Sequence, residues 1–306
     1  MPKFQVHKSI FVESPVKRVY DSVRDFKQWP AWSPWLIAEP DSRMDYSADG
    51  KSYAWDGKIT GSGEMKIIGE NPQTIDYQLT FLKPWKSVNS ARFLFADRNG
   101  GTEVTWTMEG SLPFFMFWMK SMMAGYVGAD YQRGLMMLKA VIETGSNPSK
   151  LDFIGLKSFP GFHYVGVKTR CPIADIAANM QRDMAKLTQW LGTSGHQPSG
   201  KPFSICHKWD LGKGTTDYTL AFPFTTTPTG LSNDFVSGAV PACKVYQVRH
   251  TGPYRFLGNA WAAGVMHGRA KVYTPDKKID AFEVYENDPT AVPENELVTI
   301  LHFPVK

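Results

Sequence analysis

The sequence lacks most features that mark secreted, metal-binding or nucleotide-binding proteins. Its three cysteines, Cys171, Cys206 and Cys243, are far apart and form no Cys-x-x-Cys pair for zinc or redox chemistry. No Gly-x-Gly-x-x-Gly or Walker pattern is present, and the histidines have no recognisable metal-ligand spacing. We therefore expect no cofactor and no metal, and so few scattered cysteines suit a reducing cytoplasm.

Long apolar runs and blocks of like charge are also missing. The longest apolar run, 112–119, is far short of the roughly 18 residues of a membrane span, and the first residues lack the apolar stretch of a signal peptide. The net charge of +5 is spread along the chain without a basic block. We expect a cytoplasmic protein with no membrane span and no nucleic-acid partner. The aromatic residues Phe114, Phe115, Phe117 and Trp118 leave an interfacial membrane contact open.

Aromatic and thioether side chains are plentiful, with 10 Trp, 19 Phe, 12 Tyr and 13 Met. Such side chains line adaptable ligand pockets, and they also fill ordinary cores. A chain of 306 residues exceeds what one core usually organises, so we expect two domains. The Gly-Ser-Asn-Pro-Ser segment at 145–149 is typical of a linker, which places the domains at 1–147 and 151–306.

The first half follows the order strand, helix, several strands and one long helix. An extended segment at 4–12 precedes Ser14, which we expect to cap a helix that begins with Pro15. Turn signals separate the strands, and Asn99-Gly100 predicts a hairpin. The closing helix has apolar residues at spacings of three and four: Met119, Met122, Met123, Tyr126, Val127, Tyr131, Leu135, Leu138 and Ile142. This order predicts an α+β fold in which an antiparallel sheet wraps the last helix.

Two segments of this half are distinctive: I-F-V-E-S-P-V-x-x-V-Y at 10–20 and W-P-x-W-S-P-W at 29–35. With the closing helix they resemble the helix-grip (SRPBCC) superfamily of START, pathogenesis-related allergen and polyketide cyclase-like proteins, over about residues 3–145. The resemblance implies a ligand cavity between sheet and helix. The alternative is that most of the aromatic residues there only pack in the core. The residues expected at the cavity are Trp35, Trp55, Tyr77, Trp85, Trp106 and Tyr126.

The second half contains an internal repeat. A shift of 81 residues places Val167 on Val248 and Phe222 on Phe303, among other pairs. Each copy has the pattern of a strand, a turn ending in proline, a helix and two further strands. Neither copy can bury its sheet face alone, so we expect the two to pack about a pseudo-two-fold axis and leave a groove between them, a common place for ligands.

Three stretches of this half are characteristic together: V-R-H-T-G-P-Y at 248–254, F-E-V-Y-E-N-D-P at 282–289 and E-L-V-T-I-L-H-F-P-V at 296–305. They resemble the GyrI-like family, the effector-binding domain of AraC-type and multidrug-responsive regulators, over about residues 155–306. The resemblance implies that Glu283 is the acidic residue that faces cationic or polar ligands in the groove.

Strand alternation supports Glu283 independently, because it places Glu283 and Tyr285 on one face and Phe282 and Val284 on the other. A partly desolvated carboxylate attracts a cation, and each well-placed ring adds about 0.5–2 kcal/mol by cation–π contact. The alternative is a solvent-exposed glutamate on an edge strand. The expected ligand-binding residues of this half are Glu283, Tyr285, Tyr254, Trp261, Trp209 and His302.

Two functions follow from these features. The first is binding of lipophilic small molecules, aromatic cations among them, for sensing or sequestration, without a DNA-binding domain in this chain; sensing then requires a separate regulatory protein. The second is a hydrolase or cyclase that acts on hydrophobic or strained natural products, with Glu283 as general base, since some GyrI-like proteins are reported to hydrolyse such compounds. A third function, inhibition of a protein, needs an acidic surface that this basic chain does not suggest.

Overall fold

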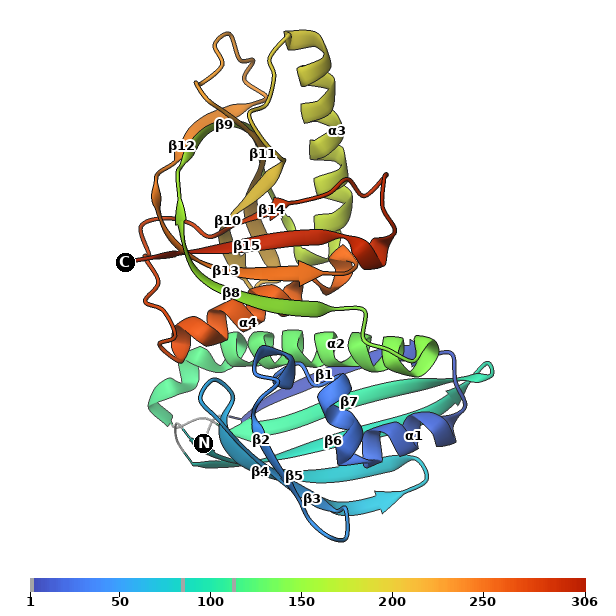
Figure 1. Ribbon diagram of the computed structural model, residues 1–306. Coiled ribbons are helices and arrows are strands. Elements are labelled where there is room, and N and C mark those ends of the chain that lie inside the picture. Colours follow the sequence, from blue (N-terminus) through green and yellow to red (C-terminus); the bar gives the residue numbers. More distant parts are fainter. Residues whose placement is uncertain (1–2, 84–85, 112–113) are drawn as a thin grey trace. The chain divides into compact units, whose positions relative to one another are not determined.

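The computed structural model describes residues 3–83, 86–111 and 114–306 (Figure 1). The chain forms two compact units, Met1–Ser149 with Val265–Ala270, and Lys150–Gly264 with Lys271–Lys306. Each unit is built on an antiparallel sheet, which confirms the predicted α+β class. In the described part of the chain, no helix has the length and apolar character needed to cross a bilayer.

The first unit has the predicted helix-grip order of elements. Within its described residues the sheet has seven strands, in the order β1 (Lys3–Val12), β7 (Gly101–Ser111), β6 (Ser87–Arg98), β5 (Thr74–Lys83), β4 (Gly61–Asn71), β3 (Ser52–Gly57) and β2 (Arg43–Tyr46). Its helices are α1 (Val16–Arg24), the 3₁₀ turns η1 (Phe26–Ala31), η2 (Leu36–Ala38) and η3 (Phe114–Met119), and α2 (Lys120–Thr144).

Local sequence explains the ends of these elements. Asn99 and Gly100 both have positive φ, 50° and 82°, as a two-residue hairpin turn requires, so the predicted hairpin between β6 and β7 is confirmed. The predicted cap of α1 is wrong, because Pro15 occupies the N-cap position and the Ser14 side chain makes no capping bond. The amide of Ser14 instead donates to Val12 O, which turns the chain out of β1.

Helix α2 lies along one face of this sheet (Figure 1) and buries its second half against it. Trp106 on β7 stacks on Tyr131 of α2 with ring centroids 3.8 Å apart and planes 13° from parallel. Gly134, one turn further on, permits this approach, because a Cβ there would lie 2.9 Å from the Trp106 ring. The core between sheet and helix is therefore filled largely by aromatic rings.

The second unit has a sheet of eight strands, and residues 150–306 are described throughout. The strand order is β12 (Val236–Val240), β9 (Phe162–Pro172), β11 (Thr215–Phe224), β10 (Phe203–Asp210), β14 (Phe282–Tyr285), β15 (Val298–Val305), β13 (Cys243–Thr251) and β8 (Lys150–Phe159). Its helices are η4 (Ile173–Asp175), α3 (Ile176–Ser194), η5 (Tyr254–Phe256), the first part of α4 (Gly258–Arg269) up to Gly264, and η6 (Glu294–Glu296).

This strand order confirms the predicted duplication. The copies are β9-α3-β10-β11 and β13-α4-β14-β15, and they meet at the antiparallel pair of β10 and β14. Strands β12 and β8 extend the two outer edges, so the order is symmetric about the central pair. The pseudo-two-fold axis therefore passes between β10 and β14.

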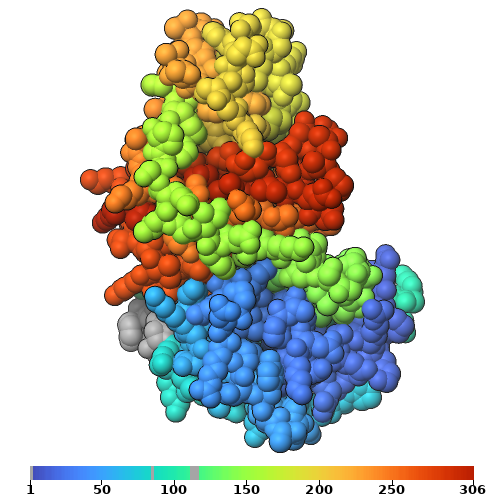
Figure 2. Space-filling view, viewed as in Figure 1, coloured from blue at the N-terminus to red at the C-terminus, as the bar shows by residue number. Residues whose placement is uncertain are grey.

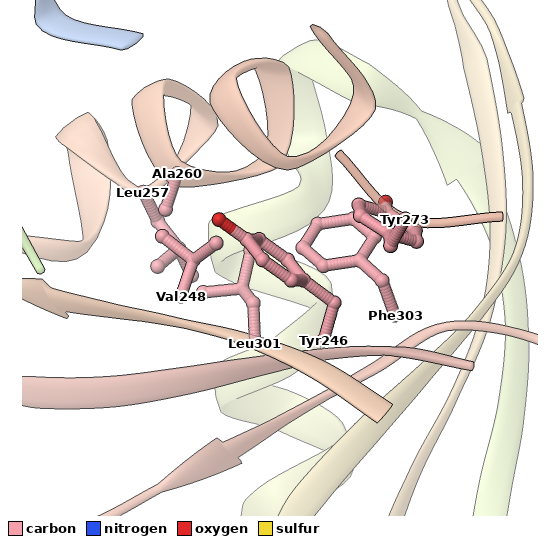
Figure 3. Packing of buried hydrophobic residues seen from close by; sticks show 7 residues of the cluster. All are labelled: Tyr246, Val248, Leu257, Ala260, Tyr273, Leu301 and Phe303. Carbon is pink, nitrogen blue, oxygen red and sulfur yellow. The ribbon is translucent and has the colours of Figure 1, made fainter. Parts of the chain in front are cut away.

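Each helix packs on its own half of this sheet. Under α4, the ring of Tyr246 stacks on Tyr273 with centroids 4.6 Å apart, beside Phe303 (Figure 3). Near the end of α3, Trp190 contacts Phe235 with centroids 5.3 Å apart, and the segment 225–235 lies beside the helix (Figure 2). Burying each such ring stabilises the fold by roughly 1.5–3 kcal/mol.

Candidate functional site

Glu283 lies at the centre of the second sheet, next to the pseudo-two-fold axis. On β14 it pairs with Ser204 of β10 on one side and with Leu301 of β15 on the other. The residue is only 5% exposed, so the alternative of a solvent-exposed glutamate is wrong. A short strand in the middle of a sheet thus buries a carboxylate where the two copies join.

Both oxygens of this carboxylate accept hydrogen bonds from aromatic side chains. Trp261 Nε1 on α4 donates to Oε2 at 2.5 Å, and the Tyr285 hydroxyl donates to Oε1 at 2.7 Å. Tyr285 is two residues away on the same strand, as alternation predicted. The indole comes from the helix above and holds the other oxygen.

Burial is the main electrostatic effect on this group. Desolvation raises the pKa of Glu283 to about 7, and the hydrogen bonds from Tyr285 and Trp261 lower it by less. No basic side chain in the described part of the chain is among the causes of this shift. Near neutral pH the carboxyl is therefore close to half ionised, and its ionised form gains no resolved stabilisation from a basic side chain among the described residues.

Further side chains surround the carboxylate and its phenol partner. Tyr254, 36% exposed, makes an edge contact with Tyr285 with centroids 5.6 Å apart, and burial raises its own pKa to about 12. On α3, the Met180 Sδ lies 3.4 Å from the Tyr285 hydroxyl. Aromatic and thioether groups from both helices and the sheet therefore converge on Glu283, a set suited to flat or bulky apolar molecules.

Sequence reasoning missed three residues near this carboxylate: Met180, Ser204 and Cys206. Ser204 faces Glu283 across the central strand pair, and burial together with the charge of Glu283 raises the pKa of the Cys206 thiol. These residues lie about 80–100 positions before Glu283, so no local motif links them. The internal repeat was the one feature of the sequence that could have indicated them. It implies that equivalent strands of the two copies, here β10 and β14, pair at the pseudo-two-fold axis.

Trp209 lies at the surface of β10 and is 40% exposed. His302 does not lie at the expected site. His302 pairs with Phe282 and stacks on its ring with centroids 4.5 Å apart, on the sheet face opposite Glu283. Its Nδ1 lies 3.1 Å from Ile300 O, and burial lowers its pKa to about 4, so the ring is neutral at pH 7. The expectation that His302 lines the same groove as Glu283 is therefore corrected.

Of the aromatic residues expected at a cavity in the first unit, Trp35, Tyr77 and Trp106 lie in one packed cluster that includes Trp29. Tyr77 and Trp106 are fully buried, and the Tyr77 hydroxyl donates to Val23 O at 3.2 Å. Trp35 joins Trp106 with centroids 5.8 Å apart.

Trp55 is connected to this cluster through Tyr53, whose ring centroid is 5.7 Å from that of Trp55 and 6.0 Å from that of Trp29. Trp55 packs on Phe81 with centroids 6.0 Å apart, and Tyr126 is exposed on α2. Trp85 lies outside the described residues. The packed core around Trp106 is the arrangement given above as the alternative to a cavity.

Metal chemistry has no site in the described part of the chain. Among those residues, no group of three His, Cys, Asp or Glu side chains is placed to hold an ion. Glu283 itself is a buried carboxylate among aromatic rings, which can attract a cation or accept a proton.

The fold and this acidic site define a protein with a helix-grip unit and a duplicated, small-molecule-binding unit. Residues 154–306, half of the chain, match the GyrI-like small molecule binding domain, and the chain belongs to this family. Residues 3–143 match the family described as polyketide cyclase / dehydrase and lipid transport. Both matches confirm the resemblances drawn from the sequence.

Comparison with solved structures gives distant similarities. A chain of the EcmrR–DNA complex is 16% identical with a TM-score of 0.45, over 59% of this chain and 66% of that one, slightly less than two thirds. SAV2435 bound to tetraphenylphosphonium is 16% identical with a TM-score of 0.39, over 49% of this chain and 92% of that one. The Aha1 dimer from Colwellia psychrerythraea is 14% identical with a TM-score of 0.35, over 46% and 97%. Comparison with curated proteins gave no match.

Proposed function

We propose that the GyrI-like unit binds lipophilic aromatic cations at Glu283 and that the protein acts in sensing or sequestration of such compounds. One observation supports this most directly. The buried carboxylate of Glu283 accepts hydrogen bonds from Trp261 and Tyr285, and among the described residues no basic side chain contributes to its pKa. A buried charge without a counter-ion is unfavourable, and a ligand cation relieves that cost.

Ligand entry requires a rearrangement at the carboxylate. Glu283 is 5% exposed because the protein's own side chains cover it, so a cation reaches the oxygens only after the Trp261 indole moves aside. The displaced indole then offers its face to the ligand, and with Tyr254 it supplies cation–π contacts of about 0.5–2 kcal/mol each. The bond between Trp261 and Glu283 thus closes the site when it is empty.

This proposal includes the cellular setting. We place the domains at 1–147 and 151–306, in the cytoplasm, where the free thiols of Cys171, Cys206 and Cys243 remain reduced. For the sensing role we propose a separate regulatory protein as partner. Sequestration requires only the ligand.

Binding of tetraphenylphosphonium, a permanent lipophilic cation, tests the proposal by calorimetry and thermal unfolding. We expect the wild-type melting temperature to rise with ligand and the rise to disappear in Glu283→Gln. Glu286→Gln is the matched control, because Glu286 loses the same charge but pairs with Lys201 at the surface. Equal stabilisation of the Glu283 and Glu286 variants would show that the carboxylate at 283 does not recognise the cation.

A second function is favoured by the raised pKa of Glu283. A carboxyl with a pKa of about 7 suits a general base, so the site could also hydrolyse strained, electrophilic natural products. Incubation with such a compound distinguishes the two functions. Consumption of many equivalents that stops in Glu283→Gln while binding persists supports the enzyme, and capture of one equivalent supports the binder.

A further inference from the structure

One end of the helix-grip unit has exposed apolar side chains from η3, α2 and two neighbouring strands. Trp118 is 68% exposed and Phe117 is 62% exposed, far more than is usual for such large rings. We call the whole set the apolar rim, and its residues are Leu82, Val88, Phe117, Trp118 and Met122.

Strand register places Leu82 and Val88 at the end of the sheet from which the chain continues to η3. Lys3 pairs with Ser111, the last residue of β7, and continuation of the β6–β7 register brings Val88 level with Ser111. Turn η3 begins three residues after Ser111, so it starts within about 10 Å of the sheet end. Leu82 lies one residue before the end of β5 at this end.

The charges around the apolar rim are mostly positive. Exposed lysines stand at the start of β1, before β6 and at the start of α2: Lys3, Lys86 and Lys120. Between residues 110 and 129 Lys120 is the only charged residue. Two acidic neighbours are already bonded: Glu109 accepts from Gln5 Nε2 at 3.0 Å, and Asp56 pairs with Lys83.

We propose that the apolar rim docks on the surface of an anionic lipid bilayer. Trp118 and Phe117 insert among the lipid headgroups and upper acyl chains, where aromatic rings are favoured, and the three lysines contact headgroup phosphates. Aromatic residues mixed with lysine fit a lipid surface better than a protein partner, because the cores of protein interfaces are depleted in lysine.

Docking of this kind is independent of the cation site. It uses residues of the first unit only, so it does not depend on Glu283 or on the proposed function. A lipophilic compound partitions into membranes, and a protein held at the bilayer surface meets it there at raised concentration. A protein that does not dock on membranes can still bind cations at Glu283, and a protein that does not bind cations can still dock.

Co-sedimentation of the full chain with vesicles tests the proposal. We use phosphatidylcholine alone and a 3:1 mixture with phosphatidylglycerol, at about 0.1 M salt, where charge attraction is only partly screened. We expect binding to the anionic vesicles, at least a tenfold loss of affinity in the double variant F117S/W118S, and weakening at high salt. The matched control is Ile68→Ser, an equally exposed apolar residue (59%) about 20 Å from the rim end of β4.

Several outcomes would overturn the proposal. These are no binding of the wild-type protein to anionic vesicles, equal binding by the double variant, or an equal loss in Ile68→Ser. Circular dichroism of each variant identifies unfolding, and Trp118→Ser alone then provides a milder test with an expected partial loss. A wild-type dimer that becomes a monomer in F117S/W118S would assign the apolar rim to a protein interface instead.

Discussion

Trp261 Nε1 donates a hydrogen bond of 2.5 Å to Glu283 Oε2 and so links the first turn of α4 to the central strand pair of the sheet. The bond joins a helix of the second repeat to the position where both repeats meet. In the proposed binding mode a cation displaces this indole, and the contact would then couple ligand binding to the packing of α4. The protonation state of Glu283 without ligand is therefore expected to affect both the stability of this unit and its affinity for a cation.

The first prediction concerns stability as a function of pH. The folded pKa of Glu283, about 7, is above its ordinary value of 4.5, so the folded state holds the proton more tightly than the unfolded state. The contribution of this proton to the free energy of unfolding is fully present below pH 4.5. It is lost as the pH rises through 7, so the free energy of unfolding falls by about 3 kcal/mol in total. We expect Glu283→Gln to gain stability over the wild-type protein by about this amount between pH 5 and 8.

Urea unfolding of both proteins at several pH values measures this difference. Histidine titrations such as that of His302 affect both proteins alike and cancel in the comparison. Glu286→Gln serves as control and should follow the wild-type curve. A pH-independent gap between wild type and Glu283→Gln would mean that the carboxyl is not shifted.

The second prediction concerns affinity. Only the ionised form of Glu283 attracts a cation strongly, and with a pKa of about 7 roughly a tenth of it is ionised at pH 6. Binding of tetraphenylphosphonium, whose own charge does not titrate, should therefore be about tenfold tighter at pH 8 than at pH 6. Titration calorimetry at both pH values gives the ratio, and in Glu283→Gln this ratio should fall to one.

Much of the fold followed from the sequence because its signals were local or repeated. The periodicity of α2, the Asn99-Gly100 turn and the shift of 81 residues each specify an element or a relation between elements. Strand β8 and strand β12 were not anticipated as edges of the second sheet, because the predicted repeat began at the strand that follows each of them, although the same shift of 81 residues places the end of β8 on β12.

The site was predicted less well because it depends on register between distant strands. Alternation put Glu283 with Tyr285, but only the pairing of Phe282 with His302 decides that His302 faces the other way. The indole of Trp261 was expected near Glu283, but its hydrogen bond depends on how α4 packs, which no spacing in the chain specifies.

A buried acid on α3 leads to the third prediction. Asp183 is 1% exposed and accepts hydrogen bonds from Thr169 Oγ1 and the Tyr218 hydroxyl, both at 2.7 Å. The sequence offered a signal for it, because Asp183 is three residues after Met180 and four before Leu187, on the buried stripe of the helix. Asp183→Ala leaves two buried hydroxyls without this acceptor.

We expect Asp183→Ala to lower the free energy of unfolding by about 3 kcal/mol. Asp175→Ala is the control at the start of the same helix, where the side chain makes no capping bond, and its cost should stay below about 1 kcal/mol. Denaturant unfolding of both variants gives the comparison. Similar losses in the two would show that the buried contacts of Asp183 contribute little.

The last prediction concerns the close packing of α4 on the sheet. A Cβ added at Gly264 would lie 2.1 Å from the ring of Phe303, whereas one at Gly192 near the end of α3 would meet nothing within 4 Å. Alanine favours helices over glycine by roughly 0.5–1 kcal/mol, so the same substitution should act in opposite directions at the two sites. Gly192→Ala should stabilise the protein by up to that amount, and Gly264→Ala should destabilise it by about 1–3 kcal/mol, because the buried Phe303 ring must shift.

Thermal unfolding of both variants measures these changes in stability, and tetraphenylphosphonium binding adds a second readout. If α4 presents Trp261 to Glu283 through its contact with Phe303, Gly264→Ala also weakens binding while Gly192→Ala leaves it unchanged. A stabilised Gly264→Ala variant with normal binding would show that the helix can move away from the sheet at no cost.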